Sequence, residues 1–479
     1  MKFNRTKSAA KRPNMINFAG GQAHGISAKH ELISILLTSF LQDQFYRRGD
    51  ATANRLSQLV ASIPDKRFVA KAALYARKEA GMRSVSHLVA GELAQTVKGE
   101  EWTKAFYDRV VHRADDVTEI LAYTLAVHGR PVPNALKKGL GMALARFDAH
   151  QLAKYRREKA ALKLVDAVNL VHPPHTEAIG ALVDGSLAPA QTWETKLSQA
   201  GQEAESDKEK SELKLAAWTE LIVNRKIGYF ALLRNLRNLI EQAPGLVDSI
   251  IPILTDRTMI RRSLVMPFRF RSALDAVEAM ATAPRPVRQK VIRGLNRAVD
   301  LSLENIPAFR GDTLIAMDCS GSMIGKPMKV GSLFAAALYK STRADLMLFS
   351  NEARFECFNA SDSTLSIAQR IEGKAEWNGT NFHSIFRRAD RAYDRIVILS
   401  DMQAWIGHWT PRAEMDHYVN RVGKRPRIFS FDLAGYGSLQ FPEADVYALA
   451  GFSEKTLEVM RFLEEDKSAL IRRIEAIDL

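Results

Sequence analysis

The chain has 479 residues and carries 68 Lys and Arg against 54 Asp and Glu, a formal net charge of +14. This length exceeds what one hydrophobic core usually supports, so we expect at least two domains. The excess of positive charge favours polyanionic partners. Only two cysteines are present, without a paired spacing, so the sequence implies neither a disulfide framework nor a structural zinc site, and it favours a reducing compartment.

The N-terminal segment, residues 1–14, is basic and is not followed by an apolar segment. We therefore expect a flexible basic arm and not a secretion signal. No run of about 18 apolar residues occurs in the sequence, which predicts that no helix of the chain spans a membrane. These features together predict a soluble cytoplasmic protein.

The first large domain is predicted over residues 15–306 and is helical. Apolar residues recur there with the spacing of one helix face, as at Leu32, Ile35 and Leu36, and Gly or Pro breaks separate segments of about 10–20 residues. Amphipathic helices in tandem each need a neighbour to bury their apolar stripe, which favours an α-solenoid of stacked helical pairs. A plain multi-helix bundle is the alternative.

The second domain is predicted over residues 307–479, where the periodicity changes. Short apolar or β-branched segments alternate with helical patterns, at 314–317, 345–349, 354–358, 395–399 and 427–433. Such alternation predicts a doubly wound α/β domain, with a mostly parallel sheet and helices on both faces.

A candidate cation site begins where the first of these strands ends. The loop Asp318-Cys319-Ser320-Gly321-Ser322 offers one carboxylate and two hydroxyls at alternate positions, and oxygen ligands of this kind suit Mg²⁺, with Mn²⁺ as a second possibility. By itself this pattern is more typical of an ordinary turn. Thr380 in a Gly-bearing loop and Asp401 at the end of another strand complete the set, because the carboxyl ends of parallel strands share one edge of a sheet.

Charge is distributed unevenly between the two predicted domains. Residues 306–479 hold 22 basic and 23 acidic side chains, whereas residues 1–305 hold 46 basic and 31 acidic ones, a net charge of +15. Solvated helix faces rich in Lys and Arg are the plainer explanation. The imbalance in one part only nevertheless predicts that the helical domain binds a polyanion.

Several segments resemble known families. The set Asp318, Ser320, Ser322, Thr380 and Asp401 resembles the metal-ion-dependent adhesion site (MIDAS) of von Willebrand factor A domains. In the helical domain, the segments NFAGG at 17–21, ALLRNL at 231–236 and MPFRF at 266–270 resemble the TROVE module of the Ro autoantigen family. The two resemblances follow one another in the order that Ro-type proteins have, and together they cover nearly the whole chain.

The Ro resemblance implies an architecture and a function. It implies a ring of HEAT-like helical repeats closed by the A domain, with an outer face for small structured Y RNA and a central hole for single-stranded ends of misfolded RNA. By position, Lys154 and His172 match family residues that contact Y RNA, and Arg156 and Arg157 lie beside Lys154. Where the family has a further arginine, this chain has Glu158 or Lys159, which leaves that contact open.

Other basic residues are candidates on physical grounds. Cations on one helix face gain phosphate contacts by counterion release, and aromatic neighbours can stack unpaired bases. These patterns select Arg234 and Arg237, one turn apart, the pair Arg261 and Arg262, and Arg269 and Arg271, which alternate with Phe268 and Phe270. The plainer readings are a helix-end role for His172, a structural role for Arg234, core positions for the two phenylalanines and solvated faces for the arginine pairs.

Catalysis is not predicted. Ser320 and Ser322 have no evident base, and His383 and His408 have no companion carboxylate for a triad. We predict a monomeric, non-catalytic RNA-binding scaffold or chaperone that forms a ribonucleoprotein in RNA quality control, with an exoribonuclease or another protein docked at the metal site. The alternatives are an A-domain adaptor for a ring ATPase and a metal-dependent nuclease.

Overall fold

The structure is a computed structural model of the chain. It describes residues 15–16, 22–25, 27–38, 49–157, 159–190, 193–202, 206–263, 265, 267–281, 283–306, 309–359, 361–403, 411–433, 438–439, 446–449, 460 and 469–479. The basic arm predicted at 1–14 lies outside the described residues.

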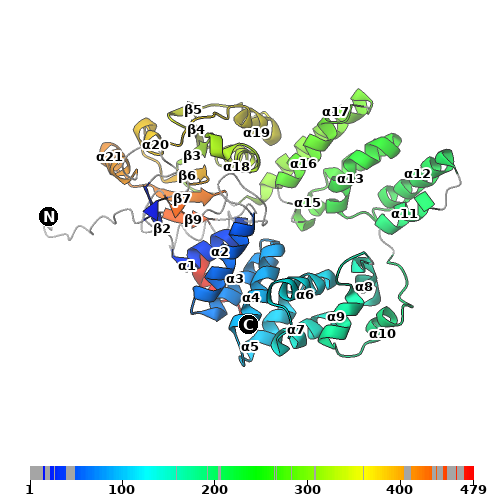
Figure 1. Cartoon of the computed structure of the whole chain (residues 1–479). Helices are drawn as coiled ribbons and strands as arrows, with labels where there is room; N and C mark the ends of the chain where they lie inside the picture. The colour runs from blue at the N-terminus through cyan, green and yellow to red at the C-terminus, as the bar shows by residue number, and fades with distance from the viewer. Residues whose placement is uncertain are drawn as a thin grey trace.

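Helices follow one another through the first part of the chain, joined by short connections (Figure 1). They are α1 (Ala28–Thr38), α2 (Gly49–Ser62), α3 (Lys66–Lys78), α4 (Ser84–Thr96), α5 (Trp102–Arg109), α6 (Ala114–His128), α7 (Asn134–Ala145), α8 (Ala149–Tyr155), α9 (Leu164–Val171), α10 (Glu177–Val183), α11 (Trp193–Gln202), α12 (Asp207–Val223), α13 (Tyr229–Gln242), α14 (Val247–Leu254), α15 (Arg257–Ser263), α16 (Pro267–Glu278) and α17 (Arg285–Ser302).

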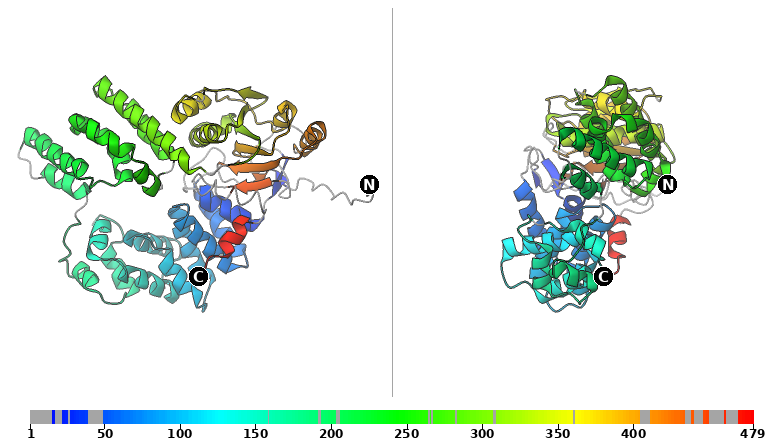
Figure 2. Two further views of the ribbon diagram at one scale, coloured as in Figure 1. Left: turned by 180° about the vertical axis from the view of Figure 1, so that it is seen from behind. Right: turned by 90° about the vertical axis from the view of Figure 1, so that its right-hand side faces the viewer.

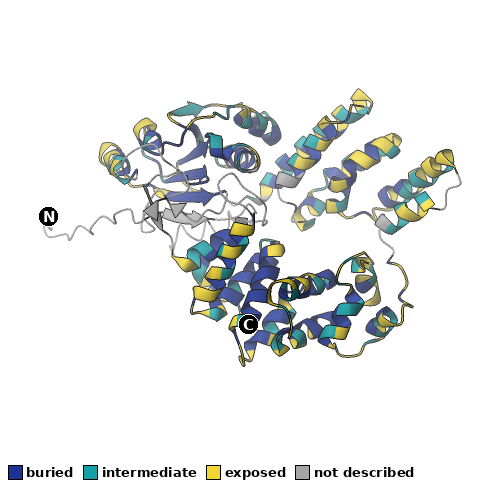
Figure 3. Ribbon diagram, in the orientation of Figure 1, coloured by how far each residue is buried: buried dark blue, intermediate teal, exposed yellow. Residues whose placement is uncertain are grey.

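Local sequence explains these helices. α8 begins at a capping box, in which the Asp148 side chain accepts a hydrogen bond from the N–H of Gln151 and the Gln151 side-chain oxygen accepts one from the N–H of Asp148. α13 is amphipathic: its leucines, such as Leu232 and Leu236, are buried, while Arg234 is exposed. Figure 3 shows the same division along several other helices, such as α12 and α17, whereas α4 is buried all round from Val85 to Ala94.

The second part of the chain forms an α/β domain around a six-stranded sheet of order β5-β4-β3-β6-β7-β9. The β4–β5 pair is antiparallel and the other pairs are parallel. The strands are β3 (Thr313–Asp318), β4 (Asp345–Phe349), β5 (Ala353–Glu356), β6 (Arg395–Ser400), β7 (Arg427–Asp432) and β9 (Val446–Leu449). The helices beside it are α18 (Lys326–Thr342), α19 (Thr364–Glu372), α20 (His383–Arg388) and α21 (Arg412–Val422).

Alternate residues of the central strands pack on opposite faces of this sheet. Ile315 and Met317 of β3 belong to the core that includes α18 and α19, whereas Leu314 and Ala316 belong to the core that includes α20 and α21. Both faces are therefore buried, as a doubly wound sheet requires. The predicted fold class, a helical N-terminal domain followed by a doubly wound α/β domain, is confirmed.

The α/β domain contacts both ends of the helical domain. On one side, Asp300 of α17 accepts hydrogen bonds from the N–H of Thr364 at 3.0 Å and from Lys340 at 3.1 Å. On the other side, β2 (Gln22–Gly25) pairs antiparallel with β8 (Ser438–Leu439), and α1 lies beside α23 (Ala469–Glu475). The chain thus curves back on itself (Figures 1 and 2). None of the described helices is long and apolar enough to cross a membrane.

Candidate functional sites

The five residues of the candidate cation site come together at one edge of the sheet. Asp318 ends β3, and Asp401 follows the last residue of the adjacent parallel strand β6. Both carboxylates are fully buried, at 0% exposure, and the three hydroxyl residues Ser320, Ser322 and Thr380 are also buried. The parallel arrangement places the two strand ends side by side, which is why residues 83 positions apart in the sequence meet here.

Backbone hydrogen bonds hold the loop that carries the first two hydroxyls. The N–H of Ser320 donates to Oδ1 of Asp318 at 2.9 Å, and the hydroxyls of Ser320 and Ser322 lie 3.5 Å apart. The loop therefore folds back over the carboxylate that precedes it and presents both hydroxyls on the same side.

The loop that carries Thr380 is fastened to its neighbours. The N–H of Gly321 donates to the carbonyl of Asn378 at 3.1 Å, and the N–H of Gly379 donates to the side chain of Asn351 at 3.0 Å. Trp377 begins this loop beside Gly321, and its side chain is 79% exposed. A large exposed aromatic group thus stands at the rim of an otherwise buried site.

The two carboxylates are buried without a protein cation. Ser400 donates to Oδ2 of Asp318 at 2.5 Å and the N–H of Gln403 donates to Oδ1 of Asp401 at 3.2 Å, but no Lys or Arg of the described residues pairs with either carboxylate. Oδ2 of Asp401 is buried and has no hydrogen-bond partner among the described residues. Sequence reasoning missed Ser400 and Gln403, although Ser400 directly precedes Asp401 and Gln403 follows it by two positions.

Burial raises the pKa of Asp318, against hydrogen bonds from Ser320 and Ser400 that lower it. Burial, followed by the negative charge of Asp318, raises the pKa of Asp401 further. Both shifts have the same physical origin, because each carboxylate has left water without gaining a positive partner. An unbalanced pair of this kind, with an acceptor oxygen left over, fits a small hard cation.

The composition of this site limits the chemistry that it can perform. Two carboxylates and three hydroxyls supply oxygen ligands and leave a bound cation electrophilic, so that it accepts a further ligand from outside. Paired-metal hydrolytic sites use several carboxylates. Within the described ranges, no group of three or more His, Cys, Asp or Glu side chains is placed to hold a metal.

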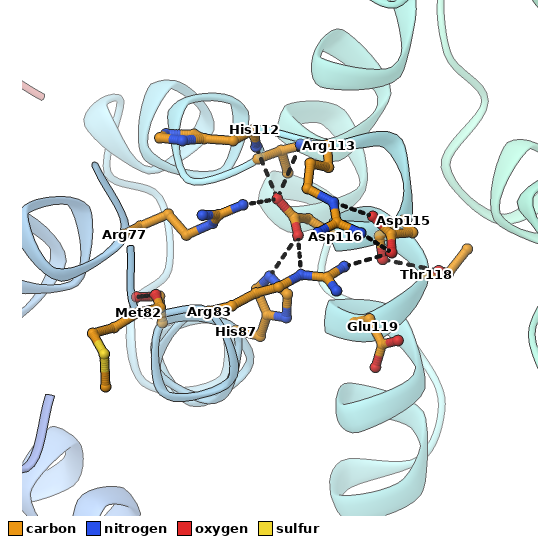
Figure 4. A network of polar contacts seen from close by, with 12 residues as sticks. Arg77, Met82, Arg83, His87, His112, Arg113, Asp115, Asp116, Thr118 and Glu119 are labelled. Atoms are coloured by element: carbon orange, nitrogen blue, oxygen red, sulfur yellow. Dashed lines mark hydrogen bonds and ion pairs between the residues drawn. The ribbon is translucent and has the colours of Figure 1, made fainter. Parts of the chain in front are cut away.

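A second pair of aspartates lies in the helical domain, at the start of α6 (Figure 4). Asp116 accepts hydrogen bonds from Arg77 at 2.8 Å and Arg83 at 2.6 Å, and from the backbone N–H groups of His112 and Arg113 at 2.9 and 3.0 Å. Burial alone would raise the pKa of Asp116, but contacts with His87 and Arg77 outweigh it and hold the pKa well below its usual range.

The neighbouring carboxylate, Asp115, holds two arginines at the surface. It pairs with Arg113 at 3.0 Å and with Arg157 at 3.1 Å, and these side chains are 38% and 55% exposed. The guanidinium of Arg113 lies 4.5 Å from the centre of the Tyr155 ring, and the ammonium of Lys154 lies 5.6 Å from it. We call Arg113, Lys154, Tyr155 and Arg157 the Tyr155 cluster.

The Tyr155 cluster unites predicted residues and adds one. Lys154, Arg156 and Arg157 are exposed around the end of α8, as a polyanion-binding surface requires. Arg113 was missed by sequence reasoning, and its signal was its position, separated by one residue from two consecutive aspartates at a helix start. His172 ends α9 in the left-handed conformation with φ 48° and is exposed, so it occupies a helix end, as the plainer reading has it.

The remaining predicted cations are distributed over α13, α15 and α16. Arg234 and Arg237 are exposed on α13, and Arg261 and Arg262 are exposed on α15. The side chain of Arg269 lies outside the described residues. These positions are separate from the Tyr155 cluster, so the structure divides the predicted basic residues between two surfaces.

Arg271 and Phe270 of α16 make contacts within the protein and are not available to a ligand. Arg271 is 11% exposed and pairs with Asp275 at 2.8 Å and with Glu372 of α19 at 2.9 Å. This arginine therefore joins the helical domain to the α/β domain. Phe270 is fully buried at 0% exposure against Tyr229, which agrees with the core reading and not with a base platform.

A cavity of about 280 Å³ opens between α13 and α16. Arg234 and Arg237 line it together with Phe230, which is 45% exposed. The floor of the cavity is apolar, because Leu233 and Leu236 of α13 are buried, and the small side chains Ser272, Ala273 and Ala276 of α16 line the rest of it.

Comparison with protein families identifies the helices that carry this cavity. Residues 185–296, from α11 into α17, match the model of the TROVE domain. This part of the chain is similar to the TROVE domain. The predicted resemblance is thereby confirmed, and Arg234, Arg237, Arg261 and Arg262 all lie within the matched residues, whereas the Tyr155 cluster precedes them.

Two proteins of known description are similar to this chain in sequence. The chain is 26% identical over 243 residues to a protein of Deinococcus radiodurans described as RNA-binding protein RO60, a match that covers 45% of this chain and 44% of that one. It is 25% identical over 168 residues to telomerase protein component 1 of Rattus norvegicus, covering 33% of this chain and 6% of that one. The matches thus span less than half the length of either relative.

A solved structure has the same fold. The crystal structure of the Deinococcus radiodurans RO (RSR) protein superposes with a TM-score of 0.63 at 20% sequence identity, over 91% of this chain and 100% of that one. The likeness extends over both the helical and the α/β domain.

Proposed function

We propose that this chain is a non-catalytic RNA-binding scaffold. The observation that carries the proposal is the TROVE domain, whose helices expose Arg234, Arg261 and Arg262 without an ion pair to any described residue. One relative is described as an RNA-binding protein, and another as a component of telomerase. The excess of positive charge in the helical domain supplies long-range attraction for a polyanion.

In this proposal, two surfaces of the protein bind different parts or kinds of RNA. The Tyr155 cluster, with Arg156 beside it, binds the backbone of a small structured RNA of the Y type, since Asp115 holds Arg113 and Arg157 in place before the RNA arrives. The TROVE domain binds single-stranded ends of misfolded RNA. The complex is a cytoplasmic ribonucleoprotein of one protein chain that acts in RNA quality control.

The site of Asp318, Ser320, Ser322, Thr380 and Asp401 holds Mg²⁺, or Mn²⁺ in its place, in this proposal. Support comes from the unbalanced buried carboxylates and the unpaired oxygen of Asp401. The bound cation takes a carboxylate of a partner protein as its outer ligand, and an exoribonuclease is a fitting partner for an RNA-holding scaffold. The hydroxyl-rich donor set favours docking over hydrolysis.

A retention assay tests the proposal. The full chain is incubated with a labelled RNA hairpin in Mg²⁺, and bound and intact RNA are measured as salt is raised. We expect retention without cleavage, and affinity that falls steeply with salt. Cleavage that is lost in Asp401→Asn would favour a nuclease, and absence of binding at low salt would contradict the scaffold and favour an adaptor role.

A further inference from the structure

The cavity between α13 and α16 combines three kinds of surface in one place. Phe230 supplies an exposed aromatic edge, Leu233 and Leu236 supply an apolar floor, and Arg234 and Arg237 supply positive charge at the rim. The basic, aromatic and apolar groups all come from α13, where they recur at helical spacing. Proteins bind a ligand with a flat apolar part and an anionic part by such a combination.

The two arginines at the rim have free donor capacity. Arg234 is exposed and has no hydrogen bond or ion pair with the described part of the chain. Arg237 is 65% exposed and uses Nε to bond Glu241 at 3.0 Å, while no partner among the described residues engages its two terminal nitrogens. Since one planar guanidinium can donate two parallel hydrogen bonds to two oxygens of a phosphate, these nitrogens suit a phosphate better than they suit a neutral group.

The walls of the cavity are held in place. Tyr229 donates from its hydroxyl to the carbonyl of Leu254 at 2.7 Å, and its ring meets buried Phe270 of α16 edge to face at 6.2 Å. α13 and α16 are therefore joined by a packed aromatic pair. The side chains that α16 contributes to the cavity, Ser272, Ala273 and Ala276, are small and leave its space open.

The volume of the cavity restricts its occupant. Protein pockets for complete small ligands measure about 300–1,000 Å³, so a cavity of about 280 Å³ takes one ring system and not a folded element. Unpaired RNA bases are flat, and they stack on aromatic side chains with little dependence on sequence. Each base carries its own phosphate, at a distance that the rim arginines can reach.

We propose that this cavity binds one unpaired nucleotide of a single-stranded RNA segment. The base enters against Phe230 and the leucine floor, and the adjoining phosphate lies on Arg234 and Arg237. The inference rests on the proposed RNA-binding function and assigns the recognition of unpaired RNA to one site of the TROVE domain. A base-paired RNA cannot use the cavity, because its bases are stacked inside the helix.

The test compares two RNAs, a blunt hairpin and the same hairpin extended by an unpaired oligouridine tail. Ala276→Phe fills the cavity from an exposed position without changing charge, and Arg234→Ala removes the free cation. Ala279→Phe and Arg388→Ala are the matched controls, since both positions are exposed and neither lines the cavity. Thermal unfolding of each variant checks that the fold is retained.

We expect both cavity variants to lose the gain in affinity that the tail provides, by roughly five-fold or more, as removal of one stacked base implies. Affinity for the blunt hairpin should change less, and both controls should match the wild type. Replacing the tail uridines by 4-thiouridine and irradiating should join RNA to the peptide that contains Phe230.

Each contrary outcome is distinct. If Ala276→Phe lowers the affinity for both RNAs equally, or if crosslinks fall only outside α13 and α16, the cavity is not the nucleotide site. The proposed RNA-binding function would remain in place. Tail binding that is unaffected by either cavity variant would overturn the cavity assignment as well. If the wild type binds neither RNA, the proposed function itself fails, and the cavity assignment fails with it.

Discussion

The two domains each bury a pair of aspartates, and the pairs are treated in opposite ways. In the helical domain, Asp115 and Asp116 are surrounded by arginines and backbone N–H groups, so the pKa of Asp116 lies well below its usual range. In the α/β domain, Asp318 and Asp401 receive only neutral donors, so their pKa values are raised.

The difference teaches how to separate structural carboxylates from ligand-binding ones. A buried carboxylate surrounded by cations has already recovered its lost hydration and stabilises the fold. A buried carboxylate pair without cations costs stability unless something positive arrives from outside. The first pair organises the surface arginines of the Tyr155 cluster, and the second is the proposed cation site.

The largest loss of stability is expected when the pair Asp115 and Asp116, which is surrounded by arginines, loses one carboxylate. Asp116→Asn leaves Arg77, which is 9% exposed at its side chain, without its charged partner, and should lower the free energy of unfolding by about 3–5 kcal/mol. Denaturant unfolding measures this. Asp416→Asn, at a surface pair with Arg425, is the control and should cost no more than about 1 kcal/mol. A loss at Asp116 as small as that of the control would contradict the comparison.

The next largest change in stability is expected at Asp318 and Asp401, the pair without a protein cation among the described residues. In metal-free buffer Asp401→Asn should be as stable as the wild type or more so, because it removes an uncompensated charge. Adding Mg²⁺ at a hundred times its Kd should stabilise the wild type by about 2.7 kcal/mol and the variant not at all. Thermal unfolding with and without Mg²⁺ reports both, and equal stabilisation of the variant would remove the cation site from Asp401.

Asp318→Ala separates the two proposed functions. Cation binding, followed by calorimetry with Mg²⁺ or Mn²⁺, should be abolished, because Asp318 is one of only two carboxylates in the set. RNA retention should stay at the wild-type level, since the Tyr155 cluster and the α13 cavity belong to the helical domain. Loss of RNA binding in a folded Asp318→Ala protein would mean that the two functions share a site.

A smaller, pH-dependent effect sharpens the comparison. The pKa of Asp116 is lower in the folded than in the unfolded chain, so its stabilisation is present at neutral pH and is lost as pH falls below the unfolded value of about 3.9. The difference in unfolding free energy between wild type and Asp116→Asn should therefore shrink by up to about 1.4 kcal/mol per pH unit in acid. A difference that grows in acid would mean that the pKa of Asp116 is raised, not lowered, in the folded chain.

The smallest effect is expected at the surface. Arg157→Ala should leave stability within about 1 kcal/mol, because the Arg157 side chain is 55% exposed. It should reduce the slope of log affinity for structured RNA against log salt by about one. Filter binding over a salt series measures the slope, with Arg388→Ala as the control, and an unchanged slope would exclude Arg157 from the RNA surface.

Much of the cation site was accessible to sequence reasoning for a definite reason. Residues at the ends of apolar strands can be placed without knowing the packing, since parallel strands bring their carboxyl ends to one edge. Asp318 and Asp401 were found in this way. That the edge lacks a protein cation was not accessible, because Lys or Arg from any other segment could have reached it.

For the basic residues, the sequence predicted less, because their ion-pair partners come from distant segments. Spacing along one helix put Arg234 and Arg237 one turn apart on α13, since a helix repeats every 3.6 residues, and the structure shows that both are exposed. The same local reasoning could not tell that Arg271 pairs with Glu372 of another domain, or that Asp115 holds Arg157 from 42 positions away.

By itself, the sequence determined the helical and α/β folds, the strand ends that carry the candidate cation site and the outward faces of single helices, because these follow from periodicity within short segments. Only the tertiary structure decided which charges are already satisfied and which remain available. The pairing of charges depends on side chains from distant segments, and their desolvation depends on everything packed around them. For this protein, that decision separates the arginines that hold the fold together from those that remain exposed to solvent.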